Sequence, residues 1–205
     1  MKRLIIYYLL FFFNISHVVK AQTLVASFQI QKNSTLTISG ESNVFPFRLV
    51  QGGESLSKNN ISIEASIAQN KIQISKNQID IAVKDFKADY GIGIHDFFKL
   101  MKVDTYPTFQ IQTENLDIFP ISTKAPSNSG TVAVNITITG VTKHYTIPIS
   151  LNNNGILYNV KGVKKICICD FGLTPPVKML GLVKLSSWIT IDFNLVCKII
   201  TNEKD

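Results

Sequence analysis

The chain has 205 residues, of which 45% are hydrophobic and 17% charged, and its 21 Lys and Arg residues outnumber 14 Asp and Glu residues, so the net charge is +7. The lysines are scattered, and they do not form the concentrated basic stripe with stacking aromatics that nucleic-acid recognition needs. The composition therefore excludes nucleic acid as a partner, suits one globular domain, and allows at most a peripheral contact with an anionic membrane.

The first 21 residues have the organisation of a cleavable signal peptide. A positive start at residues 1–3 precedes an apolar run at residues 4–13, and Val19 and Ala21 are the small residues that signal peptidase reads before its cleavage site. The apolar run is shorter than the roughly 20 residues of a membrane-spanning helix, and an uncleaved N-terminal anchor is the alternative. We therefore predict an exported protein, periplasmic or secreted, with one domain at residues 22–205.

Most of the remaining sequence alternates between apolar and polar residues with a period of two. Successive side chains of a strand point to opposite faces of a sheet, so each alternating run predicts a strand with one buried face. The predicted strands lie at residues 35–39, 46–51, 61–67, 71–75, 78–83, 108–116, 131–138, 145–151, 155–160, 165–170 and 189–197. Many short strands joined by Gly-, Asn- and Ser-containing turns predict an all-β fold, an antiparallel sandwich or barrel.

One segment between these strands has a helical period instead. Ile94, Phe97, Phe98 and Met101 are spaced i, i+3, i+4 and i+7, which places them on one face of a short helix over about residues 95–102. Such a helix either plugs the core or forms a lid over an apolar cavity, and the pattern allows both.

Residue types that carry catalytic or metal chemistry are few. His95 and His144 stand in no motif with a serine or cysteine nucleophile. Cys167 and Cys169 lie on one face of a predicted strand, without the further ligands that a metal site requires. One of them can form a bridge with Cys197 if their strands are neighbours, or all three are buried free thiols. We expect no catalytic residue, no metal and no cofactor.

Four segments, in this order, resemble the YceI-like family of exported, lipocalin-like barrel proteins. Residues 36–47 resemble its early strand, Gly-x-Ser turn and second strand, and residues 79–109 resemble its core block, in which a short helix runs into a strand that begins YPTF. Residues 130–149 contain the turn ITGVTK, and the fourth segment begins with DFG at residues 170–172, followed by two prolines and the last apolar strand.

The resemblance implies an antiparallel, lipocalin-like barrel of about eight strands with one short helix. It also implies an elongated apolar channel that binds a polyisoprenoid or other long-chain lipid, without catalysis. The channel residues that it implies are Ile38, Phe45, Phe47, Phe97, Phe98, Met101, Phe109, Val134, Ile136 and Phe171. Many members carry a histidine–serine pair in the first strand and a histidine in the second. Residues 42–47 contain no histidine, so contacts to a lipid headgroup cannot be carried over.

Three classes of function are compatible with this sequence. The first is a lipid carrier, and the second is a structural or interaction module whose packed interior holds no ligand. An interior tunnel favours the carrier, whereas a filled interior with an exposed apolar patch favours the module. An enzyme is third, because it would need a reactive His144 or a thiolate beside a base inside a pocket. The remaining partner that we consider is a second copy of the chain in a homodimer.

Overall fold

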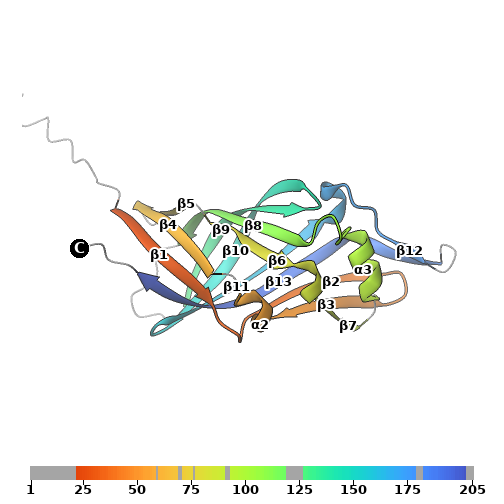
Figure 1. Ribbon diagram of the computed structural model, residues 1–205, viewed down its shortest axis with the longest axis horizontal. Helices are drawn as coiled ribbons and strands as arrows, with labels where there is room; N and C mark the ends of the chain where they lie inside the picture. Colours follow the sequence, from red (N-terminus) through yellow and green to blue (C-terminus); the bar gives the residue numbers. More distant parts are fainter. Residues whose placement is uncertain are drawn as a thin grey trace, which may run out of the picture.

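The structure is a computed structural model, and it describes residues 22–58, 60–68, 71–75, 77–90, 93–118, 127–178 and 182–201. The predicted signal peptide at residues 1–21 lies outside these ranges. The strands form an elongated body, with the last residues of the final strand at one end and the short helix α3 (Ile94–Leu100) near the other (Figure 1). No helix within the described ranges combines the length and the apolar character that crossing a bilayer requires.

In the described part of the chain, 13 strands form one antiparallel sheet. They are β1 (Gln22–Ile30), β2 (Thr35–Ser42), β3 (Pro46–Gly52), β4 (Asn60–Ala68), β5 (Lys71–Ser75), β6 (Ile79–Ala82), β7 (Lys87–Tyr90), β8 (Thr108–Ile118), β9 (Ser127–Ile138), β10 (Val141–Asn154), β11 (Leu157–Cys167), β12 (Val177–Lys178) and β13 (Val183–Thr201). Besides α3, the helical elements are α2 (Gly53–Leu56) and the 3-10 turns η2 (Val83–Asp85) and η3 (Ile168–Phe171).

The all-β fold with a short helix is confirmed, and one predicted strand needs correction. The helix predicted near residues 95–102 is α3. The strand predicted at residues 165–170 is wrong in its second half, because β11 ends at Cys167 and η3 follows. Two features bend the chain there: a disulfide joins Cys167 to Cys169, and Gly172 adopts a left-handed φ of 70°.

Strand pairing completes a circuit of eight strands at one end of the molecule. The pairs run β1–β4–β5–β8–β9–β10–β11–β13, and β13 pairs again with β1. The closing contact joins residues 26–30 of β1 to residues 197–201 of β13. We call this part the β1 half. It comprises β1, β4 and β5 together with residues 115–118, 127–133, 147–154, 157–163 and 193–201 of the longer strands.

The sheet is not closed at the other end. There the first part of β13 pairs with β2, the order continues through β3 to β7, and β6 pairs with β8. Among the described strands, β7 has no second partner, and the turn η2 connects it to β6. We call this part the α3 half: β2, β3, β6, β7, η2, α3, η3 and the adjoining residues of β8, β9, β10, β11 and β13.

Candidate functional site

The structure brings nine of the ten predicted channel residues together in the α3 half. Eight are core side chains with at most 7% of their surface exposed: Ile38, Phe47, Phe97, Met101, Phe109, Val134, Ile136 and Phe171. Phe98 packs against them and is partly buried. Phe45 lies apart on the turn between β2 and β3 and is 39% exposed. Ser42 holds that turn, because its Oγ accepts from the N–H groups of Val44 and Phe45.

Aromatic rings fill the interior of the α3 half. The ring of Phe86, which follows η2, lies 5.6 Å from the ring of Phe97 on α3 and 6.0 Å from that of Phe109 on β8, measured between centroids. The rings meet at tilted or edge-on angles, the arrangements that aromatic pairs prefer. Phe97 is buried at the centre of this group. The packing therefore favours the plug interpretation of the helix over the lid interpretation.

Several inward-facing side chains of the β1 half are only partly buried. The strand register places Leu195 of β13 opposite Val160 of β11, and Val160 opposite Leu151 of β10. Leu116 of β8 lies opposite Val132 of β9 in the same way. All five pack against the core cluster, yet each keeps part of its surface accessible. These side chains face into the circuit of strands and keep accessible surface, whereas Ile30, Ile147, Ile149 and Cys197 of the same half are buried.

Phe193 faces the interior beside these five residues, and Gly162 determines the orientation of its ring. Phe193 is directly opposite Gly162, and a Cβ added at Gly162 would collide with the Phe193 ring. The ring therefore lies over the bare backbone of β11 and along the wall of the barrel. We call Leu116, Val132, Leu151, Val160, Phe193 and Leu195 the apolar inner wall.

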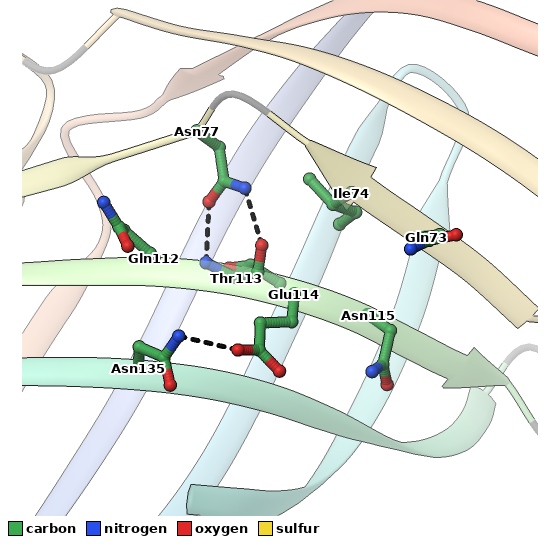
Figure 2. Close-up of a pocket in the computed structure, with 8 residues that line it drawn as sticks. All are labelled: Gln73, Ile74, Asn77, Gln112, Thr113, Glu114, Asn115 and Asn135. Atoms are coloured by element: carbon green, nitrogen blue, oxygen red, sulfur yellow. Dashed lines mark hydrogen bonds between the residues drawn. The ribbon is translucent and has the colours of Figure 1, made fainter. Parts of the chain in front are cut away.

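A polar groove lies outside this wall, where β5 and β6 separate along β8. Figure 2 shows its lining side chains, and its volume is about 480 Å³. Asn77 bridges the break between the two strands: its Nδ2 donates to the Thr113 carbonyl oxygen at 2.6 Å and its Oδ1 accepts from the Thr113 N–H at 2.7 Å. Asn135 donates to Glu114 at 2.6 Å. The groove is lined mainly by amide side chains and contains none of the predicted channel residues.

The titratable groups of the core are held in their neutral forms. Burial raises the pKa of the Cys197 thiol to about 11. Burial and the neighbouring Asp170 carboxylate raise the pKa of Tyr145 to about 12, and the Tyr145 hydroxyl donates to Asp170 at 3.3 Å. The buried polar residues of the described chain are Ser34 and Gln51, and both are uncharged. The interior thus suits an uncharged, largely apolar occupant.

Comparison with known proteins agrees with this architecture. The model of the YceI-like domain matches residues 13–197. The chain belongs to the YceI-like domain family. BcnA of Burkholderia cenocepacia is 20% identical, with a TM-score of 0.54 over 80% of this chain and 95% of BcnA. A polyisoprenoid-binding domain from Saccharophagus degradans, implicated in plant cell wall breakdown, is 12% identical, with a TM-score of 0.54 over 83% of this chain and 97% of that domain. No curated protein matches the chain.

Of the two alternatives for the cysteines, a bridge to Cys197 and three buried free thiols, neither is correct in this YceI-like protein. The disulfide joins Cys167 to Cys169, and Cys197 is a buried free thiol. The strands do pair, but the antiparallel register places Cys167 opposite Trp188. At about 3.3 Å per residue, Cys197 lies about 30 Å further along β13. The sulfur atoms of Cys167 and Cys169 also lie near the Asp170 carboxylate, but they are bonded to each other.

Sequence reasoning missed the apolar inner wall of this YceI-like chain. The alternation of β9 and β13 already identified Val132, Phe193 and Leu195 as inward-facing residues. It could not identify which inward-facing residues would be covered, because that depends on where η2, α3 and η3 pack. Once the register was known, one signal could have indicated the apolar inner wall: an inward-facing glycine opposite an aromatic residue, as at Gly162 and Phe193.

Proposed function

We propose that this YceI-like chain is an exported carrier, without catalytic activity, that binds a polyisoprenoid or other long-chain lipid inside its barrel. The observation that carries the proposal is the apolar inner wall, whose side chains face the interior and still keep accessible surface. An eight-stranded barrel either fills its interior with side chains or holds one small ligand. A lipid chain that covers this wall gains about 0.8 kcal/mol for each buried CH₂ group.

The proposal assigns different roles to the two sets of residues. The apolar inner wall would contact the lipid chain along its length. The predicted channel residues of the α3 half would form the closed end of the binding site. Phe45 would take no part, because it is exposed on a turn outside the barrel.

Two further observations support an exported, non-catalytic protein. The Cys167–Cys169 disulfide fits an oxidising compartment outside the cytosol. The remaining thiol, Cys197, has its pKa raised to about 11 and is therefore not a thiolate at neutral pH. Nucleophilic catalysis by cysteine requires the thiolate, so this buried side chain is better suited to line the core than to react.

Native mass spectrometry of protein purified from its own host would test the carrier function. We expect a bound species that organic solvent extracts as a long-chain lipid. A polar side chain on the inner wall, Val160→Gln, should abolish that species, whereas Lys161→Gln, on the opposite face of the same strand, should retain it. A uniform ligand-free mass for the unmodified protein, with nothing extractable, would count decisively against a carrier.

An interaction module is the second candidate, and an exposed apolar tip favours it. Val44 is 63% exposed and Leu182 is 73% exposed. Asn43 holds the two segments together, because its Nδ2 donates to the Leu182 carbonyl oxygen at 2.8 Å and its Oδ1 accepts from the Lys184 N–H at 2.8 Å. If the protein is free of lipid and forms a dimer that the Val44→Ser/Leu182→Ser variant dissociates in analytical ultracentrifugation, this function replaces the carrier.

A further inference from the structure

The polar groove beside β8 occupies a break in the wall of the barrel. β5 pairs with β8 as far as Gln73, which lies opposite Asn115, and β6 pairs with β8 from Ile79, which lies opposite Ile111. Among the described strands, none covers this side of β8 between the two pairs. The groove opens there with a volume of about 480 Å³, a size that is typical of sites for small molecules.

Ile74 gives the groove an apolar floor. Ile72 lies opposite the inward-facing Leu116, and Ile74, two residues further along β5, shares its inward face. Ile74 packs against the hydrophobic core and also lines the groove. The groove therefore reaches between the strands, with amide side chains around an aliphatic floor (Figure 2).

Contacts within the protein fix one side of the lining. Asn135 donates to Glu114 at 2.6 Å, and its Oδ1 lies 3.2 Å from Nδ1 of His144 on β10. The second carboxylate oxygen of Glu114, Oε2, lies 3.5 Å from the same His144 nitrogen. The Glu114 carboxylate is therefore already engaged, and it does not offer a free charge to a cationic ligand.

Gln73 and Asn115 complete the lining with free amide groups. Neither side chain forms a hydrogen bond with the other lining residues in Figure 2. Each amide has two N–H donors and a carbonyl acceptor. A hydroxyl group also both donates and accepts, so two amides on adjacent strands match neighbouring hydroxyl groups of one ligand.

The lining argues against three other classes of ligand. An anion would need Arg, Lys or clustered N–H groups, whereas the described lining contains the Glu114 carboxylate and no cationic side chain. A lipid chain would need a largely apolar lining, and Ile74 is the one hydrocarbon side chain among the described lining residues. An added peptide strand would pair with the main chain of β8, but Asn77 already occupies the N–H and carbonyl of Thr113.

We propose that this groove binds a carbohydrate through the hydroxyl groups of uncharged sugar rings. The hydroxyl groups exchange hydrogen bonds with Gln73 and Asn115, and the C–H face of a ring covers Ile74. The described lining contains no residue of the apolar inner wall, so the sugar site is separate from the proposed lipid site. The sugar is either a free saccharide or the headgroup of a glycolipid, and the test distinguishes these sources.

The test titrates the mature protein with maltose, cellobiose, lactose and chitobiose as uncharged probes, and with digalacturonic acid as an anionic probe. Nuclear magnetic resonance of isotope-labelled protein reports binding directly at the side-chain amide signals of Gln73 and Asn115. We expect saturable shifts of these signals with at least one uncharged disaccharide and none with digalacturonic acid.

Two variants separate the site from a general effect on the strand. Asn115→Leu should weaken binding of that disaccharide about tenfold, the effect of one or two neutral hydrogen bonds, and should keep the melting temperature of the unmodified protein. Gln110→Leu is the matched control, because it removes an amide from β8 outside the groove, and it should bind as tightly as the unmodified protein. If Asn115→Leu does not fold, Gln73→Leu takes its place.

Dodecyl maltoside, kept below its micelle concentration, distinguishes the two sources of the sugar. Equal affinity for maltose and dodecyl maltoside would support a free saccharide. Tighter binding of dodecyl maltoside that both Asn115→Leu and Val160→Gln weaken would support a glycolipid headgroup.

Three outcomes would overturn the inference: no binding of any uncharged probe, tighter binding of digalacturonic acid, or unchanged affinity in Asn115→Leu. None of them bears on the carrier function, which lipid extraction tests separately.

Discussion

The two halves of the barrel are built from the same long strands, yet η2, α3 and η3 pack buried side chains into the α3 half. In the α3 half, Phe86 beside η2, Phe97 of α3 and Phe171 of η3 enter the space inside the sheet and are at most 4% exposed. In the β1 half, the described inner wall consists of strand residues such as Val160 and Leu195, which keep accessible surface. Strand side chains line the inside of this barrel, and the helical segments fill it.

The connection between β10 and β11 shows how the filled half depends on its helical turns. The two strands pair up to Ile149 and Gly162, and beyond that level they separate. There η3 lies between them, and the rings of Phe171 and Tyr145 approach to 6.3 Å between centroids. Lys164 spans the same opening, because its Nζ donates to the Thr146 carbonyl oxygen at 2.9 Å. In the α3 half, η3 therefore packs into the core at the level where β10 and β11 no longer pair.

The largest expected effect is a difference in stability between two phenylalanine truncations. Phe86→Ala in the filled half should lower the free energy of unfolding by about 3–5 kcal/mol, because it removes a fully packed ring and leaves a cavity. Phe193→Ala on the inner wall should cost less, because its ring is only partly buried, but it should lower lipid affinity more. Urea denaturation measures the first effect, and lipid titration measures the second. Equal costs of the two substitutions would show that the halves are equally packed.

The second expected effect is a loss of stability at alkaline pH that originates in Cys197. Burial raises the pKa of this thiol from 9.0 to about 11, so the unfolded chain ionises first as pH rises. The free energy of unfolding should be unaffected below pH 9 and fall by about 2–3 kcal/mol between pH 9 and 11. Cys197→Ala should lack this fall, and the difference between the two proteins cancels the other titrating groups. Parallel pH profiles would show that Cys197 is accessible to water.

Much of this architecture could be predicted from the sequence. The features that could not be predicted depend on contacts between distant segments. Alternation predicted most of the strands and their inward faces, since both depend on local periodicity. It did not predict β1, which closes the circuit with β13, or β7. The spacing of Phe97 and Met101 predicted α3 for the same reason. The sequence could not indicate that these residues fill one half only, because that depends on the strand register. The same register separates Cys167 from Cys197, and no local pattern contains that information.

The third expected effect concerns the shape of the inner wall. Gly162→Ala would place a methyl group against the Phe193 ring, which must then turn away from the wall and into the lipid space. We expect a cost of about 1–3 kcal/mol in stability and a marked loss of lipid affinity. Gly52→Ala is the matched control, because a Cβ at Gly52 meets no atom within 4 Å, and it should leave both quantities unchanged. Unimpaired lipid binding by Gly162→Ala would place the lipid elsewhere.

The smallest expected effect concerns the disulfide beside η3. Because it closes a very short loop, its entropic contribution to stability is about 1–2 kcal/mol. Cys169→Ser replaces the exposed sulfur and should lower the free energy of unfolding by that amount, while lipid affinity stays the same because η3 lies in the filled half. A phosphine reductant should weaken the unmodified protein equally and leave Cys169→Ser unaffected. We infer that the α3 half and the lipid-binding β1 half are independent. If reduction instead lowers lipid affinity, the two halves are coupled through η3.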